Sequence, residues 1–336
     1  MRKLKPVLMH RMAIAAALLL AAAGAQAQSS VRLYGLMDLS VGSTKAPGGQ
    51  AATSLDSGKL STSFWGMSGT EDLGDGLAAV FKLEGFLRAD SGDLGRFNGD
   101  PVFARNAYVG LSDARYGTLT LGRNTTPLFV ATLSYNALGD SFGYSPAIRH
   151  YFTSGTVTGD SGWSQSALYS SPTFGGFRFG LASAGRTGSG VTSNGDNWSA
   201  NVSYSGGPLS GSLVVQDVRK DGATPTADTR TAQLGAAYDL QVAKVYAQYG
   251  QVQNHTSPDT YRISGLGVRA PFGVGAVVAQ WGRVDGDKSG DDRQTLTLGY
   301  THLLSKNTEL YGMLMKDKQE GKSDGRGYSA GMRLRF

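Results

Sequence analysis

The sequence lacks cysteine, and after its first 30 residues it has no long apolar run. The absence of cysteine excludes disulfide bonds and thiol chemistry. No later segment reaches the roughly 18 consecutive apolar residues of a membrane-spanning helix, so any passage through a membrane would have to use strands. Only four histidines are present, and none belongs to a His/Cys cluster. We therefore expect no metal site and no cofactor.

The first 27 residues have the three regions of a secretory signal peptide. Four basic residues flank the start of a short apolar core at residues 13–23, and Ala-Gln-Ala at 25–27 fits the small-x-small cleavage pattern. An apolar core this short cannot span a bilayer. We predict that residues 1–27 are removed and that residues 28–336 form one mature domain. The leader carries four of the 32 basic residues and no acidic one, so its removal lowers the formal charge from +6 to +2. That balance does not indicate a nucleic-acid partner.

The last ten residues alternate between two kinds of side chain. One face is apolar and ends on Phe336, whereas the opposite face carries Arg333 and Arg335. A terminal strand of this kind needs lipid on one side, water on the other and a neighbour along each edge. A closed barrel in a membrane meets these demands.

The same alternation continues through the chain in sixteen predicted strands. Seven short turns, centred on residues 72, 113, 173, 207, 241, 272 and 306, alternate strictly with eight longer polar loops. Short turns on one rim and long loops on the other are typical of an outer-membrane barrel, whereas a soluble sandwich does not require them. The 48 glycines suit tight turns and crowded barrel walls. We predict an all-β fold, a 16-stranded antiparallel transmembrane β-barrel, with strands at 31–44, 61–70, 77–87, 103–111, 117–123, 166–171, 177–185, 198–205, 209–217, 230–238, 243–250, 261–270, 275–283, 293–304, 309–316 and 327–336.

One connection, about residues 124–165, is much longer than the others. It is rich in aromatic residues and carries Asp140, Arg149 and His150. Loops longer than about 12–15 residues are usually functional or disordered, and the aromatic content argues against disorder.

Several segments resemble general porins of Gram-negative bacteria, of the neisserial and burkholderial type. The matching stretches follow the family order: 31–38, 69–77, 105–111, 116–123, 171–177 and the terminal Phe336. The resemblance implies a homotrimer of 16-stranded barrels in the outer membrane, in contact with lipid and lipopolysaccharide. It also implies export through the periplasm with chaperones, insertion by the barrel-assembly machinery, and a role for Phe336 as assembly signal.

The resemblance further implies that the third external loop, here residues 124–165, folds inward and narrows the pore. One departure concerns the second strand, where the family usually has Ser-Arg-Phe-Gly with its arginine in the pore. This chain has Ser-Phe-Trp-Gly at residues 63–66, so Phe64 removes one expected cation.

Strand phase and the resemblance together define the expected pore lining. Charges on the loop and on the facing wall would produce a transverse field that screens ions by sign. The resemblance supplies Arg105, although its strand neighbours at 107, 109 and 111 are apolar. Strand phase places Lys244 and Arg269 in the lumen as well. The expected constriction and lining residues are Tyr34, Asp38, Lys82, Glu84, Arg88, Arg105, Asp140, Arg149 and Arg178.

We expect a water-filled channel for passive diffusion of ions and small hydrophilic solutes, with a mild anion preference. A solute-selective porin, for example one for an anion, is the alternative, and an outer-membrane hydrolase is less favoured. His150 and His255 fall in predicted loops and His302 at the membrane rim, and no Gly-x-Ser-x-Gly motif accompanies them. We therefore do not expect an enzyme.

Overall fold

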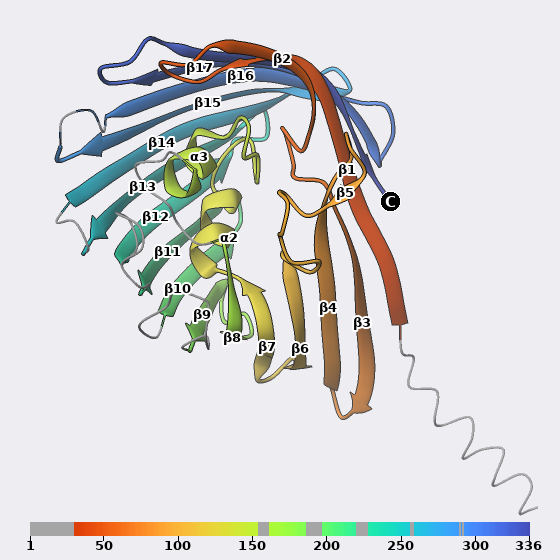
Figure 1. Ribbon diagram of the computed structural model, residues 1–336. Helices are drawn as coiled ribbons and strands as arrows, with labels where there is room; N and C mark the ends of the chain where they lie inside the picture. Colours follow the sequence, from red (N-terminus) through yellow and green to blue (C-terminus); the bar gives the residue numbers. More distant parts are fainter. Residues whose placement is uncertain are drawn as a thin grey trace, which may run out of the picture.

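The computed structural model describes residues 30–153, 161–185, 197–219, 228–255, 259–288, 290 and 292–336. The predicted signal peptide, residues 1–27, lies outside the described residues. Sixteen antiparallel strands form a closed barrel, each bonded to the next and the last bonded to the first (Figure 1), which confirms the predicted fold class. The sixteen are β1 (Ser30–Lys45), β3 (Phe64–Gly74), β4 (Leu77–Arg88), β6 (Asn106–Asp113), β7 (Gly117–Thr125), β8 (Gly162–Ser170), β9 (Phe177–Ala184), β10 (Asn197–Gly206), β11 (Leu209–Val218), β12 (Thr229–Asp239), β13 (Lys244–Asn254), β14 (Asp259–Phe272), β15 (Gly275–Gly286), β16 (Arg293–Leu303), β17 (Thr308–Gln319) and β18 (Gly325–Arg335).

The two ends of the described chain close the barrel. Strand β18 pairs with β1 from Leu36↔Arg335 to Lys45↔Arg326. Beyond the strand, Phe336 N donates to Gly35 O at 3.1 Å and Gly35 N donates to Phe336 O at 3.0 Å. The Phe336 ring lies against Gly35, where an added Cβ would be 2.5 Å from Phe336 Cζ. The seam therefore depends on a residue without a side chain opposite the terminal aromatic ring.

The predicted alternation places apolar side chains outside and polar side chains inside. On β1, Val31 and Leu33 are 69% and 64% exposed, whereas Asp38 and Ser40 on the opposite phase are buried. This is the arrangement that a barrel surrounded by lipid requires, because the hydrocarbon excludes charge and the lumen accepts it.

Two short strands were not predicted. Strand β2 (Ala51–Ser57) pairs with the upper half of β1, and β5 (Asp93–Leu94) pairs with the end of β4. After β2 the chain turns through residues 58–63, and both Leu60 and Ser61 are buried. For this reason β3 begins at Phe64 rather than at residue 61, where the sequence pattern had placed its start. Strand β6 likewise begins at residue 106 rather than 103.

The long connection after β7 contains two short helices that the sequence pattern did not predict, α2 (Pro127–Ser134) and α3 (Pro146–Phe152). Each starts at a Thr or Ser whose hydroxyl accepts a backbone N–H bond, followed by proline at the first turn. Figure 1 shows both helices within the space that the strands enclose. Their apolar side chains form one cluster with residues of β11, β13, β14 and β15. No helix among the described residues is both long enough and apolar enough to cross a membrane.

Candidate pore constriction

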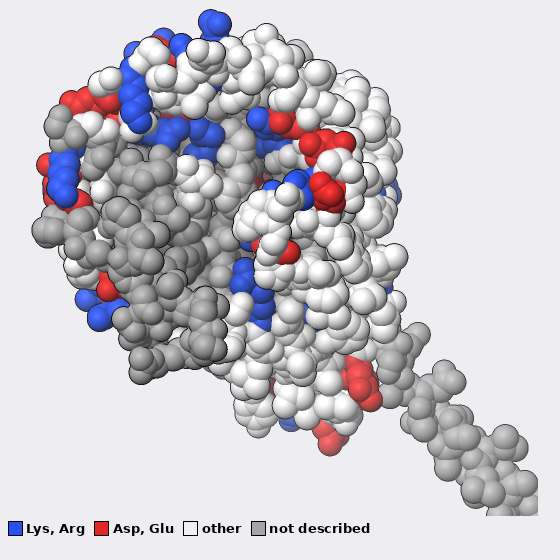
Figure 2. All heavy atoms as spheres, viewed as in Figure 1, with Lys and Arg blue, Asp and Glu red and all other residues white. Residues whose placement is uncertain are grey.

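A cavity of about 730 Å³ lies between residues 133–140 of the long connection and the barrel wall. We call this space the constriction cavity. The wall side of the cavity is formed by β1, β3, β13, β14 and β16–β18, together with the segment that precedes β3. Figure 2 shows Lys and Arg side chains beside the hollow on this face of the molecule. The charged residues of the cavity are Arg269, Arg333, Arg335 and Asp140, and its aromatic residues are Tyr34, Phe64, Tyr246 and Phe336.

Two of the three arginines share one carboxylate. Glu309, 2% exposed, forms an ion pair with Arg333 and lies 4.0 Å from Arg269 Nη2 through its Oε1. Arg333 Nη1 also donates to Ser61 Oγ at 2.6 Å, and Ser61 Oγ donates to Asp140 at 3.0 Å. In the described part of the chain, the exposed side chain of Arg335 has neither an ion pair nor a hydrogen bond. Its guanidinium is therefore the least compensated charge of the cavity.

A second group of charges lies next to Phe64. Glu84, 2% exposed, accepts hydrogen bonds of 2.6 Å each from Tyr34 Oη, Arg105 Nη1 and Asn106 Nδ2. Lys82 Nζ lies 3.9 Å from the same carboxylate. The Arg105 guanidinium lies 4.2 Å from the centroid of the Phe64 ring. Arg105 precedes β6, so the alternation of that strand does not apply to it, and the apolar neighbours at 107, 109 and 111 do not conflict with its position.

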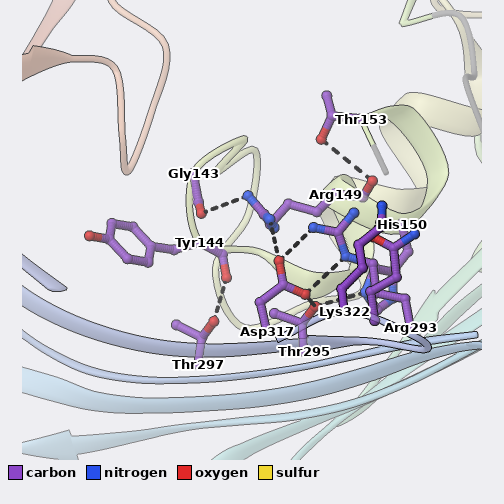
Figure 3. Close-up of polar contacts among 11 residues, drawn as sticks. Gly143, Tyr144, Arg149, His150, Thr153, Arg293, Thr295, Thr297, Asp317 and Lys322 are labelled. Atoms are coloured by element: carbon purple, nitrogen blue, oxygen red, sulfur yellow. Dashed lines mark hydrogen bonds and ion pairs between the residues drawn. The ribbon is translucent and has the colours of Figure 1, made fainter. Parts of the chain in front are cut away.

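A third group holds α3 against the wall, as Figure 3 shows. Arg149 Nη2 of α3 donates to Asp317 Oδ2 at 2.7 Å, and Arg293 Nε of β16 donates to Asp317 Oδ1 at 2.9 Å. Thr295 Oγ1 donates to the same carboxylate at 3.0 Å, and His150 Nε2 lies 2.9 Å from Thr295 Oγ1. Because Asp317 is 1% exposed, this carboxylate is an internal anchor for the loop.

The carboxylate of Asp38 does not line the water path, and the prediction that placed it there needs correction. Asp38 faces inward, as the alternation predicts, but it is fully buried. Its Oδ2 accepts the backbone N–H groups of Leu60 and Ser61 at 2.9 and 2.6 Å, and its Oδ1 accepts the hydroxyl of Tyr311 at 2.6 Å. Asp38 therefore holds the inward turn before β3, because those buried N–H groups need an acceptor.

The remaining predicted residues, Arg88, Arg178 and Lys244, do not line the constriction cavity, although Lys244 lies next to its lining residue Tyr246. Arg88 is at the end of β4 and contacts Asn98 at 2.7 Å and Asp93 of β5 at 3.3 Å. Arg178 on β9 donates to Thr173 Oγ1 at 3.3 Å and lines a second, smaller cavity. Lys244, at the start of β13, lies 5.6 Å from the Tyr246 ring centroid.

Three important interior residues were missing from the predicted pore lining: Arg333, Arg335 and Glu309. The terminal alternation places both arginines on the charged face of β18, so strand phase is the signal that identifies them as interior residues. Glu309 could not be found in this way, because its role depends on contacts with β14 and β18.

The buried His150 predicts a pH dependence of the loop anchor. Burial, reinforced by Arg293 and Arg149, lowers the pKa of His150 from 6.5 to about 3. A released loop would take up a proton near pH 6.5, and the anchored loop would not. The anchored state therefore keeps its full stability above that pH and loses about 1.4 kcal/mol per unit as the pH falls towards 3. Single-channel recordings should become noisier between pH 6 and 4, and His150→Gln should reduce that change. Identical acid profiles for both proteins would contradict this role of His150.

Among the described residues, no group of three or more His, Asp or Glu side chains could hold a metal ion.

A family model described as Gram-negative porin matches residues 13–322. Outer membrane porin protein 32 of Delftia acidovorans is 35% identical over 320 residues, which cover 91% of this chain and 89% of that protein. An outer membrane porin protein of Bordetella pertussis is 29% identical over 367 residues, which cover 90% of this chain and 93% of that protein. The solved structure of an anion-selective porin from Comamonas acidovorans has a TM-score of 0.78 at 30% identity, and covers 92% of this chain and 100% of that one.

Proposed function

The chain belongs to the Gram-negative porin family, and on that premise we propose that the constriction cavity is the ion path of an outer-membrane channel with a mild preference for anions. The channel passes ions and small hydrophilic solutes by passive diffusion. The observation that carries the preference is Arg335, an exposed guanidinium in the cavity that forms no ion pair with any described residue. A similar chain, the porin from Comamonas acidovorans, is described as anion-selective.

The charge balance of the barrel interior also supports a preference for anions. In the three groups around the loop, together with Asp38, seven basic side chains face five carboxylates. Most of these charges form pairs, so the excess is small. In a wide aqueous pore, each unpaired charge contributes only about 1 kcal/mol, and salt screens it. The preference is therefore mild and decreases as the salt concentration rises. The seven are Lys82, Arg105, Arg149, Arg269, Arg293, Arg333 and Arg335, and the five are Asp38, Glu84, Asp140, Glu309 and Asp317.

Replacing Arg335 with serine should reduce the anion preference. We expect the anion-to-cation permeability ratio at low salt to fall by up to about fivefold, which corresponds to about 1 kcal/mol, and the effect to disappear near 1 M salt. The measurement is the reversal potential of planar bilayers in a salt gradient. Arg115→Ser is the matched control, because Arg115 is paired with Asp113 at a turn between strands. An unchanged reversal potential for Arg335→Ser at low salt would remove the constriction cavity from the ion path.

Export and assembly complete the proposal. The three regions of the leader support a cleaved signal peptide at residues 1–27. The resemblance implies chaperone-assisted passage through the periplasm, insertion by the barrel-assembly machinery, and a homotrimer among lipid and lipopolysaccharide. Protein purified from outer membranes should begin at Gln28 by mass spectrometry. Before heating it should migrate in gels as a trimer, and after heating as a monomer. A retained leader would contradict the first statement, and a monomer at all temperatures would contradict the second.

A further inference from the structure

One aromatic side chain lies between a group of charges and the constriction cavity. Phe64, the first residue of β3, lines that cavity together with Tyr34 of β1. Lys82, Glu84 and Arg105, which we call the Glu84 group, are not among the described residues that line it. The Phe64 ring touches both, because it lines the cavity and also lies against Arg105.

The Glu84 group carries one positive charge in excess. The Glu84 carboxylate accepts a bond of 2.6 Å from Arg105 Nη1 and lies 3.9 Å from Lys82 Nζ, so two cations share a single anion. In the interior as a whole, the seven basic side chains counted above exceed the carboxylates by two. The Glu84 group therefore contains a large part of the charge that favours anions.

The ring of Phe64 covers one face of the Arg105 guanidinium. The guanidinium carbon lies 4.2 Å from the ring centroid, a distance at which a planar cation is attracted to an aromatic face. The Tyr34 ring meets the Phe64 ring edge-on, with centroids 6.2 Å apart and planes at 75°, while its hydroxyl donates to Glu84 at 2.6 Å. Arg105 is thus held between the Glu84 carboxylate and the Phe64 ring.

The covered face limits how closely an ion in the constriction cavity can approach Arg105. An anion in contact with the far face of the ring would lie roughly 8 Å from the guanidinium, whereas direct contact would bring it to about 4 Å. Because the Coulomb energy falls with distance, the ring reduces the attraction between Arg105 and such an anion by about half.

We propose that Phe64 determines the strength of the channel's anion preference by positioning Arg105. Its ring keeps the guanidinium on Glu84 and prevents ions in the constriction cavity from contacting it directly. The preference of the wild-type channel is therefore weaker than its interior charges would otherwise produce. This inference rests on the proposed function, because it takes the constriction cavity as the ion path.

The test is a double-mutant cycle on Phe64 and Arg105, read from reversal potentials of planar bilayers in a potassium chloride gradient at low salt. Phe64→Ala should raise the anion-to-cation permeability ratio by about twofold, because anions can then reach the guanidinium. Arg105→Gln should lower the ratio by about twofold in the wild-type background and by about fivefold in the Phe64→Ala background. A wider pore alone would change the conductance but would not make the effect of Arg105→Gln depend on Phe64.

Two further variants show whether the aromatic ring is responsible. Phe64→Tyr keeps the ring and should retain the wild-type permeability ratio. Phe86→Ala is the matched control, because Phe86 pairs with Phe64 across β3 and β4 and its ring also lies near a guanidinium, that of Arg96, at 4.8 Å. Phe86 does not line the constriction cavity, so its replacement should leave the ratio unchanged. If Phe64→Ala does not assemble, Phe64→Ser uncovers the same guanidinium and takes its place in the cycle.

Equal effects of Arg105→Gln in the two backgrounds would overturn the inference, since the ring would then not control access to the guanidinium. An increase in Phe64→Tyr as large as that in Phe64→Ala would also overturn it. The proposed function is tested separately by Arg335→Ser. A channel that loses anion preference in Arg335→Ser but shows no coupling between Phe64 and Arg105 would contradict this inference alone. Coupling without any effect of Arg335→Ser would support the role of Phe64 and contradict the role proposed for Arg335.

Discussion

Asp317→Ala should release the long loop from the wall and produce a channel with a larger and noisier open current. The Asp317 carboxylate is the shared partner of Arg149 and Arg293, whose side chains are only 18% and 8% exposed. Its removal takes away the counter-charge that these two neighbouring buried cations share. Losing one partner of a buried pair typically costs about 3–5 kcal/mol. Single-channel recording measures the current, and limited proteolysis of residues 126–153 measures the release.

A matched control tests whether the burial of Asp317 causes this effect. Asp324→Ala also removes an ion pair, with Lys316, but both of those side chains are more than half exposed. An exposed pair of this kind contributes at most about 1 kcal/mol, so its loss should leave the recordings close to those of the wild type. If Asp317→Ala gave the same recordings and the same proteolysis as Asp324→Ala, the loop would be held by its apolar contacts alone.

Deleting Phe336 should sharply reduce insertion into the outer membrane while synthesis continues. The residue closes the seam with two backbone hydrogen bonds to Gly35, and its ring lies against that glycine. Its removal would leave the Gly35 N–H and C=O groups of β1 unpaired in a region where unsatisfied backbone groups are costly. We expect most of the product to be degraded or to remain outside the membrane. Quantifying heat-modifiable trimer in outer-membrane fractions, relative to total product, checks this expectation.

The comparison for this deletion is Phe272→Ala. Phe272 is another exposed aromatic residue, 66% exposed, at the turn between β14 and β15, and it takes no part in the seam. Its replacement should cause at most a minor loss of assembled protein. Wild-type amounts of trimer after deletion of Phe336 would show that the seam between β1 and β18 closes without the terminal residue.

The sequence alone was sufficient to predict the barrel, because the physical requirement is repeated in every strand. Lipid outside and water inside impose an alternation with a period of two, and short turns and long loops alternate between the rims. On β1, Val31 and Leu33 face outward and Asp38 faces inward, as that rule predicts. The prediction needs the residues of this strand alone. The length of the connection at residues 124–165, which carries Asp140 and Arg149, marked it as exceptional, whereas Arg105 was expected in the pore only from the resemblance to porins.

Only the tertiary structure decided which interior charges face water and which are used to hold the protein together. Strand phase identifies the face of the barrel on which a side chain lies, but not its depth or its partner. The Asp38 carboxylate meets the hydroxyl of Tyr311, 273 residues away, and the Glu84 carboxylate meets Arg105 across the segment before β6. Both carboxylates are removed from solvent by segments that turn inward, and the helices of the long connection bury Asp317 in the same way. Depth in the lumen is set by contacts between distant segments, and a local pattern of residues does not encode them.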